Sequence, residues 1–295
     1  MTLGEAYIQL LVALKKIYEP REAATIANLV TEHVTGYANS SRILHKNNSI
    51  TEEQNEKLQK ITLDLLAQKP VQYVLGEAYF YGMKLHVNED VLIPRPETEE
   101  LVEWIINDVK LQAEKEKNQD ATFDRKFKML DIGTGSGCIA VAIKKNLPDV
   151  TVYATDVSKK ALLTANKNAA EQATEIHFSE VNILDEQQWK AFPRLDYIIS
   201  NPPYITQSEA VSINGNVINF EPYLALFVPN ETPLLFYDII ASFGLLHLKK
   251  EGKLFFEINE AFGEEAAALL LKKNYKNIEI RKDMQGKDRM IKAEK

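Results

Sequence analysis

The stretch Phe127-Lys128-Met129-Leu130-Asp131-Ile132-Gly133-Thr134-Gly135-Ser136-Gly137-Cys138 decides the fold of this 295-residue chain. Residues 127–132 are a short run of strand type, and a run rich in Ala, Val and Ile, typical of a buried helix, begins at Cys138. Glycines permit a tight turn between the two and let a ligand approach bare backbone amides. The stretch therefore predicts a ligand-binding strand-to-helix turn.

Strand-like and helix-like segments alternate on the C-terminal side of this turn. Such alternation predicts a doubly wound α/β architecture, here a Rossmann-like, mostly parallel sheet with helices on both faces. The last two strands flank the turn-like Gln285-Gly286 and predict an antiparallel hairpin, with its antiparallel strand at one edge. The expected strands are residues 127–132, 151–156, 175–181, 196–200, 253–258, 277–280 and 289–293, and helices are expected from Cys138, Ser158 and Glu264.

The part before this sheet has a different pattern. Residues 1–75 read as a small helical domain, with Ile8, Leu11 and Val12 at helical spacing and a capping-box pattern at Thr51 and Gln54. Residues 76–98 are expected to form a β-hairpin around Gly82 and a rigid linker, and residues 99–295 the sheet domain. Inside the latter, the polar stretch 110–126 predicts a solvated helix end or loop.

Composition narrows the function classes. A net charge of −7 with scattered basic residues disfavours stable binding to long nucleic acid. No run reaches the roughly 18 apolar residues of a membrane span, and the N-terminus does not resemble a signal peptide. The single cysteine, Cys138, fits a reducing cytoplasm, where we place the protein. The five histidines show no metal-ligand spacing, so no metal is expected, and without an obvious apolar interaction stripe we expect a monomer.

The glycine-rich turn has two possible ligands. A dinucleotide fingerprint G-x-G-x-x-G is the competitor, but the third glycine comes one residue early and Cys138 occupies the expected position. Asp131 would repel a pyrophosphate and favour the ammonium and sulfonium charges of S-adenosylmethionine. Spacing and charge therefore favour that cofactor. The residues assigned to it here are Asp131, Gly133, Thr134, Gly135, Ser136 and Gly137.

Acidic residues also follow the next two strands. Asp156 ends residues 151–156, where a carboxylate can accept hydrogen bonds from two ribose hydroxyls; the alternative is a helix cap. Asp185 and Glu186 come after the third strand, where they could hold an adenine amino group, and for Asp185 a capping role is an equal alternative. Cys138 is interpreted as a small buried residue that starts a helix rather than as a nucleophile.

The second chemical motif is Asn201-Pro202-Pro203-Tyr204, directly after the strand 196–200. Consecutive prolines fix the backbone and supply no N–H, so the loop presents acceptors. The Asn201 side-chain oxygen and the Pro202 carbonyl can each accept an N–H from a planar amide or amine, and Tyr204 offers it a flat face. The motif predicts methyl transfer to such a nitrogen, with Asn201, Pro202 and Tyr204 catalytic, all four residues binding substrate, and Asn201 also contacting the cofactor.

Three other functions compete with this one. Adenine-N6 methyltransferases of nucleic acid share both motifs, but usually need a basic groove that the acidic charge disfavours. An NAD-dependent oxidoreductase would need the missing glycine spacing. A non-catalytic binding module would be expected to have lost one of the two motifs, and both are intact.

With these motifs in place, the chain resembles the PrmC or HemK family, the N5-glutamine methyltransferases of peptide-chain release factors. The resemblance runs through the sequences PVQYVLGEAYFYG, LIPRPETEELV, DIGTGSGCIA, ISNPPYI and FEPYLAL, and the ending Gly286-Lys287-Asp288-Arg289. It implies that the substrate is the glutamine of the Gly-Gly-Gln motif in class I release factors, and that the helical domain helps to dock the factor.

The resemblance also bears on individual residues. It assigns Gly133 to Gly137 and Asp156 to the cofactor, and Asn201 to Tyr204 to the glutamine. The segment Arg95-Pro96-Glu97-Thr98 would help to close the cofactor site, or would serve as a rigid connector that caps the next helix. Two departures, Phe227-Val228-Pro229-Asn230 in place of a glycine-rich turn and Asn259 in place of a glycine, are expected in loops that tolerate change.

Overall fold

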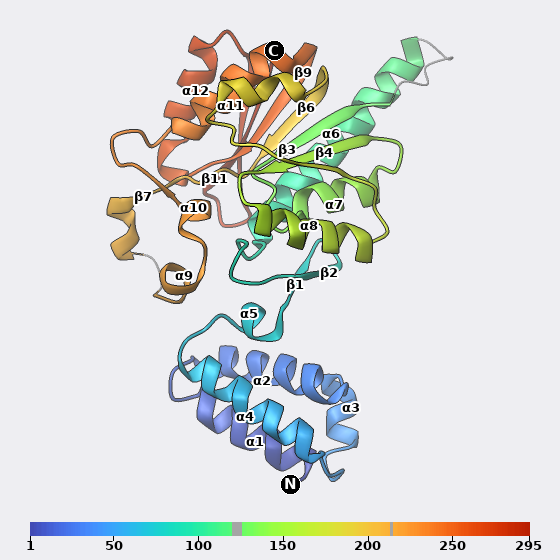
Figure 1. Cartoon of the computed structure of the whole chain (residues 1–295), viewed down its shortest axis with the longest axis vertical. Coiled ribbons are helices and arrows are strands. Elements are labelled where there is room, and N and C mark those ends of the chain that lie inside the picture. The colour runs from blue at the N-terminus through green and yellow to red at the C-terminus, as the bar shows by residue number, and fades with distance from the viewer. Residues whose placement is uncertain (120–125, 213–214) are drawn as a thin grey trace. The chain divides into compact units, whose positions relative to one another are not determined.

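The computed structural model describes residues 1–119, 126–212 and 215–295, which form two compact units (Figure 1). The smaller unit holds Met1–Glu77 and the short helix α9 (Gly215–Phe220), and the larger unit holds the other described residues. In the smaller unit the remaining helices are α1 (Leu3–Leu14), α2 (Pro20–Thr35), α3 (Asn39–Leu44), α4 (Glu52–Leu66) and α5 (Val71–Leu75).

The predicted helices of the smaller unit are present, and local sequence explains their ends. Pro20 occupies the first turn of α2, where its missing N–H costs nothing. Thr51 and Gln54 form the predicted capping box at the start of α4. Of the apolar residues that predicted α1 by their helical spacing, Ile8 and Val12 are exposed. The buried side chains of this unit's core are instead Ala6, Leu10, Leu14, Ala23, Ile26, Ala27, Val30, Leu58, Ile61 and Leu65.

A two-stranded hairpin follows, as predicted, formed by β1 (Glu77–Phe80) and β2 (Met83–His86). Its turn places both Tyr81 and Gly82 at positive φ, 48° and 72°, the conformation of a tight two-residue hairpin turn. The backbone N–H of Tyr81 donates to Glu99 at 2.8 Å. That contact holds the strained turn against the helix that follows the linker.

The larger unit is built on a seven-stranded sheet in the order β10-β11-β9-β6-β3-β4-β5. Strands β9, β6, β3, β4 and β5 are mutually parallel, and β11 runs antiparallel to both β9 and β10. The predicted antiparallel hairpin therefore forms one edge, and β11 is its reversed strand. The strands are β3 (Lys128–Ile132), β4 (Thr151–Asp156), β5 (His177–Glu180), β6 (Leu195–Ser200), β9 (Leu248–Glu257), β10 (Lys276–Lys282) and β11 (Asp288–Glu294).

Helices cover both faces of this sheet (Figure 1). Helices α6 (Pro96–Gln119), α7 (Cys138–Asn146) and α8 (Lys159–Glu171) pack on one face, and α11 (Leu235–His247) and α12 (Gly263–Lys272) on the other. Consecutive strand residues alternate between the two cores: Met129 faces the first and Leu130 the second. This period of two explains why the strands are apolar throughout, since a sheet buried on both sides leaves no polar face.

Helix α6 begins within the segment Arg95-Pro96-Glu97-Thr98, called the linker motif below, and continues to Gln119. The polar stretch 110–126 is thus helical through residue 119, in agreement with a solvated helix end, and residues 120–125 lie outside the described part of the chain. None of the helices in the described ranges is both long and apolar enough to cross a membrane.

The remaining short elements lie in the connections between these strands and helices. They are η1 (Glu186–Ala191), β7 (Ile205–Thr206), η2 (Gln207–Ser212), α10 (Tyr223–Leu226), β8 (Phe227–Val228) and η3 (Glu260–Phe262). Strand β7 pairs in parallel with β8. The expectation that residues 227–230 form a tolerant loop is therefore wrong for Phe227 and Val228, which are buried strand residues.

Candidate active site

The glycine-rich turn lies at the carboxyl end of β3, between β4 and β6. Gly133, Gly135 and Gly137 all have positive φ, and no atom of the described residues lies within 4 Å of a Cβ built on either of the first two. The amides of Gly133 and Thr134 donate to the carbonyl of Thr155 at 2.8 and 2.9 Å. The turn is thus fastened to β4 while its outer side stays open, as close approach of a ligand requires.

Gly137 and Cys138 begin helix α7. A Cβ on Gly137 would lie 3.0 Å from the Cβ of Ala165 on α8, so this glycine permits close helix packing. Cys138 is the first residue of α7 and is partly buried. Burial raises the pKa of its thiol to about 12, so the thiolate of a nucleophile is not formed. These observations agree with the interpretation of Cys138 as a packing residue.

Asp131 and Ser136 are buried polar side chains with unused hydrogen-bonding capacity. Thr134 Oγ1 donates to Asp131 Oδ2 at 2.6 Å, but within the described residues neither Asp131 Oδ1 nor Ser136 Oγ has a hydrogen-bond partner. Burial raises the pKa of Asp131 to about 7, against the effect of the Thr134 hydroxyl. A buried carboxyl without a cation and a hydroxyl without a partner fit an ammonium group of a ligand in this turn.

Asp156 ends β4 and joins the same turn. Its Oδ2 accepts from the amide of Gly135 and its Oδ1 from the amide of Ser158, both at 2.9 Å. Ser158 is itself the N-cap of α8, so Asp156 is not the helix cap but links the helix start to the glycine-rich turn. Burial raises its pKa, and the two amide hydrogen bonds oppose that rise.

The acidic residues Asp185 and Glu186 are placed differently from Asp131 and Asp156. Asp185 is the N-cap of η1 and accepts from the Gln187 amide at 3.0 Å and from the Gln188 side chain at 2.9 Å. Glu186 is exposed. Among the described residues, no hydrogen bond joins either of them to the glycine-rich turn. The geometry favours the capping alternative for Asp185.

The Asn-Pro-Pro-Tyr loop leaves β6, the strand next to β3. Ser200, the last residue of β6, is buried and donates from Oγ to the carbonyl of Ile132 at 2.7 Å. Pro202 is buried and Pro203 half-buried. Asn201 donates from Nδ2 to Thr98 Oγ1 at 3.3 Å, and no hydrogen bond among the described residues uses its Oδ1. The two sequence motifs thus meet at the carboxyl ends of adjacent strands.

Tyr204 anchors the far end of this loop. Its hydroxyl donates to Glu257 Oε1 at 3.1 Å, and burial together with the Glu257 charge raises its pKa far above the ordinary range. Asn259 Nδ2 donates to the Tyr204 carbonyl at 3.1 Å and to Glu209 Oε1 at 3.0 Å. Asn259 lies in the loop between β9 and η3, as expected, but it is buried and its amide braces the Asn-Pro-Pro-Tyr loop.

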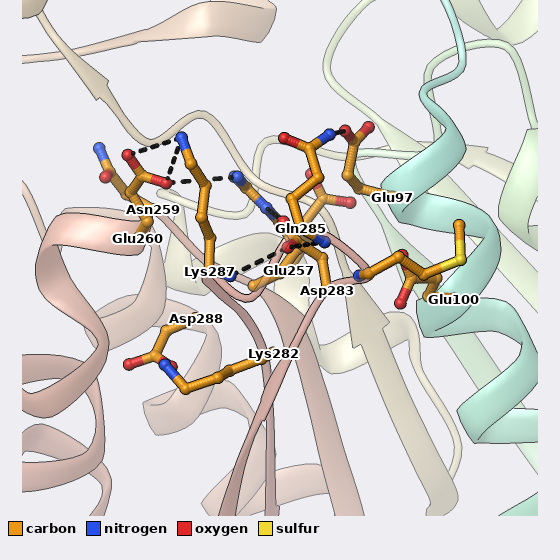
Figure 2. Close-up of polar contacts among 12 residues, drawn as sticks. Glu97, Glu100, Glu257, Asn259, Glu260, Lys282, Asp283, Gln285, Lys287 and Asp288 are labelled. Atoms are coloured by element: carbon orange, nitrogen blue, oxygen red, sulfur yellow. Dashed lines mark hydrogen bonds and ion pairs between the residues drawn. The ribbon is translucent and has the colours of Figure 1, made fainter.

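The linker motif packs against these loops. Arg95 forms an ion pair with the buried Glu221 at 2.5 Å, and the other oxygen of Glu221 accepts from the Ile93 amide at 3.2 Å. Glu97 accepts from Gln285 in the β10–β11 turn at 3.4 Å, as Figure 2 shows. The motif therefore connects α6 to two distant segments of the larger unit.

Sequence reasoning missed four residues of this site: Thr98 as a partner of Asn201, and Glu221, Glu257 and Asn259. Glu257 and Asn259 stand in the segment EINEAFG at the end of β9, and Glu221 in FEPYLAL. A polar residue at the carboxyl end of a sheet strand is a usable signal, because ligands bind at that edge. No group of three or more potential metal ligands is found in the described parts of the chain.

A mostly parallel sheet in this order, with a glycine-rich turn and an Asn-Pro-Pro-Tyr loop at its carboxyl edge, defines a class I methyltransferase. The model of the methyltransferase small domain matches residues 117–219, and that of the PrmC N-terminal domain matches residues 5–76. Among solved structures, the hMettl16 catalytic domain in complex with MAT2A 3′UTR hairpin 6 covers 83% of this chain and 81% of its own, with a TM-score of 0.52. At 16% identity that likeness shows the fold alone.

Closer relatives specify the family. The release factor glutamine methyltransferase of Flavobacterium psychrophilum is 43% identical over 285 residues, 97% of this chain and 96% of that relative. The Bacteroides thetaiotaomicron protein of the same name is 38% identical over 283 residues, 95% of this chain and 96% of its own length. The chain belongs to the family of release factor glutamine methyltransferases.

Proposed function

We propose that this protein transfers a methyl group from S-adenosylmethionine to the side-chain N5 of the glutamine in the Gly-Gly-Gln motif of class I peptide-chain release factors. Family membership supports the reaction class and the substrate. The observation that carries the proposal is the orientation of Asn201, whose Nδ2 is engaged by Thr98 while its Oδ1 stays available.

The loop supplies what an amide nitrogen needs in order to react. The lone pair of such a nitrogen is delocalised into its carbonyl group, which makes it a weak nucleophile. The Asn201 Oδ1 accepts one N–H of the glutamine amide and the Pro202 carbonyl accepts the other, which orients the nitrogen and stabilises positive charge as it develops. One of these protons leaves, to the loop or to water, as the new C–N bond forms.

The turn after β3 has the donors and acceptors to hold the cofactor. The Asp131 carboxyl and the Ser136 hydroxyl fit its ammonium group, the open amides at Gly133 and Gly135 fit its close approach, and Asp156 is our candidate for the ribose hydroxyls. When bound, S-adenosylmethionine supplies an electrophilic methyl group. Glu186 stays a candidate for the adenine side, with Asp185 shaping the neighbouring η1 turn.

We further propose that the helical unit, residues 1–75, docks the release factor, with residues 76–98 as the connection to the methyltransferase unit at 99–295. Exposed apolar side chains on α1 and α4, namely Ile8, Val12 and Leu63, support a protein partner. A monomeric cytoplasmic enzyme without metal is the arrangement that fits this function, since release factors act in the cytoplasm.

Mass spectrometry tests the proposal directly. A release factor produced without its methylase is incubated with the purified protein and S-adenosylmethionine, and its Gly-Gly-Gln peptide is sequenced by fragmentation. The expected result is one added methyl group on the glutamine side chain. An unmodified peptide, with methyl transfer into adenine of added nucleic acid instead, would overturn it in favour of adenine-N6 methylation.

A further inference from the structure

A closed set of polar contacts surrounds Glu257, the last residue of β9. Its carboxylate is buried, with Oε2 accepting from Thr98 Oγ1 at 2.6 Å and Oε1 accepting from the Tyr204 hydroxyl at 3.1 Å. Thr98 Oγ1 in turn accepts from Asn201 Nδ2 at 3.3 Å. One carboxylate therefore reaches both ends of the Asn-Pro-Pro-Tyr loop, one directly and one through a threonine at the start of α6.

Strand register explains why these residues meet. Ser200 of β6 pairs with Phe256 of β9, so Asn201 and Glu257 leave adjacent parallel strands at the same level. Thr98 is carried to this level by the linker and the first turn of α6, which the Arg95–Glu221 ion pair holds in place. The set is built by three segments distant in sequence.

The direction of each hydrogen bond follows from counting protons. A threonine hydroxyl has one proton, and Thr98 uses it on the Glu257 carboxylate, which can only accept. The Thr98 oxygen is then left to accept, so it selects the NH₂ side of the Asn201 amide. The Asn201 Oδ1 is consequently turned away from Thr98 and left to accept from another donor.

Burial and the neighbouring groups act in opposite directions on the pKa of Glu257, and burial has the larger effect. Burial raises its pKa, and the hydroxyls of Thr98 and Tyr204 and the positive charge of Arg289 act in the opposite direction. Arg289 is held by Asp283, with 3.2 Å between Nε and Oδ2, inside the β10–β11 turn whose other contacts appear in Figure 2. Arg289, in the ending Gly286-Lys287-Asp288-Arg289, thus opposes part of the rise in the pKa of the carboxyl that accepts from both hydroxyls.

We propose that Glu257 is a positioning residue for methyl transfer, which acts through Thr98 to set the orientation of the Asn201 amide and through the Tyr204 hydroxyl to set the ring of Tyr204. This gives the threonine of the linker motif a defined part in the reaction. The inference rests on the proposed function, because the orientation of the Asn201 oxygen matters only if that oxygen accepts an N–H of the substrate.

Glutamine in place of Glu257 would disturb this set with little change in size. Its side chain accepts at one atom and donates at the other, so it cannot accept from both hydroxyls. A donor facing Thr98 would turn the Thr98 proton towards Asn201, and the Asn201 amide would then present its NH₂ group to the substrate. Valine at position 98 would remove the hydroxyl, whereas serine would keep it.

The test compares Glu257→Gln, Thr98→Val and Thr98→Ser in the full chain, with Glu264→Gln as a matched control, because Glu264 is exposed in the first turn of α12. Steady-state kinetics on release factor and calorimetry with S-adenosylmethionine are measured for each. We expect E257Q and T98V to lose about 10-fold or more in kcat, as for the loss of one preorganised polar contact, with cofactor Kd within about 2-fold. T98S and E264Q should stay within about 2-fold in kcat.

Side-chain amide NMR of Asn201 completes the test, since it does not depend on turnover. T98V should shift the Asn201 NH₂ resonances and T98S should leave them near their original positions. The inference is overturned if T98V and T98S give the same spectrum, if E257Q and T98V keep full kcat, or if cofactor Kd rises in step with the loss of kcat. If the unaltered protein does not methylate the Gly-Gly-Gln glutamine, the proposed function is rejected instead.

Discussion

The backbone amide of Gly135 donates to Oδ2 of Asp156 over 2.9 Å, so the carboxylate at the end of β4 holds the middle of the glycine-rich turn. Because Oδ1 of the same side chain accepts from Ser158, Asp156 is fixed before any ligand arrives. A pre-oriented carboxylate at this edge loses little entropy on binding a ribose. Substitutions of Asp156 and of Asn201 should consequently distinguish cofactor binding from the action of the Asn-Pro-Pro-Tyr loop.

Asp156→Ala should weaken cofactor binding by about 10-fold or more, because it removes a charged acceptor and also releases the turn at Gly135. Calorimetric titration with S-adenosylmethionine measures the change. Asp156→Asn serves as the matched control, since it keeps one acceptor oxygen and should lose less affinity. Unchanged affinity in the alanine variant would contradict the assignment.

Asn201→Ala should have the opposite signature. The side chain acts on the nucleophile, so kcat should fall by about 100-fold or more while cofactor Kd changes little. Single-turnover assays with saturating cofactor and release factor measure the chemical step. If this variant lost cofactor affinity more than Asp156→Ala did, the two loops would have been assigned the wrong way round.

Cofactor affinity should depend on pH through Asp131. Its pKa of about 7 reflects burial without a cation, and a positively charged ligand binds the ionised form more tightly. Affinity should therefore be constant above about pH 7 and fall as pH decreases below it, with proton release on binding. Calorimetry in buffers of different ionisation enthalpy measures both, and Asp131→Asn should bind more weakly with a flat pH profile.

Gly137→Ala should destabilise the larger unit more than Gly286→Ala does. Both glycines have positive φ, 79° and 83°, so both substitutions introduce backbone strain of about 1 kcal/mol. Only at Gly137 does the new methyl group meet a neighbour, Ala165 Cβ at 3.0 Å. Thermal unfolding should show a clearly lower Tm for G137A, and equal values would argue against the close packing of α7 and α8.

The docking role of the helical unit predicts a defect confined to large substrates. Replacing both Ile8 and Val12 with glutamate should raise KM for the intact release factor several-fold and leave KM for a short Gly-Gly-Gln peptide unchanged. Leu271→Glu on α12 is the control, because Leu271 is equally exposed but belongs to the other unit. An equal KM increase for both substrates would indicate a folding defect instead.

Much of the fold was predictable because its signals are local. The turn after β3, the capping box at Thr51 and the hairpin turn at Gly82 each depend on residues that are neighbours in sequence. The seven strands were recognisable as apolar runs that alternate with helices. A local pattern does not reveal burial: the helical spacing of Ile8 and Val12 correctly predicted a helix, yet both side chains are exposed.

The partners of Asn201 could not be predicted in the same way. Thr98 and Glu257 come from segments 103 residues before and 56 residues after it, and they meet only through the register of β6 with β9 and the start of α6. The sequence also does not show which way the Asn259 side chain points. In the structure its amide donates to the Tyr204 carbonyl. Side-chain networks of this kind depend on tertiary structure.

The pairing of β7 with β8 has a consequence for how this chain can vary. Ile205 lies beside Phe227 in the two-strand ladder, so the segment between them leaves and returns at the same place. Glu209 and Glu221 within this segment hold Asn259 and Arg95, so variation that keeps these two contacts has little cost to the loop that precedes Ile205. Changes in this segment, natural or engineered, could therefore alter which surfaces the enzyme recognises while the Asn-Pro-Pro-Tyr loop before it stays the same.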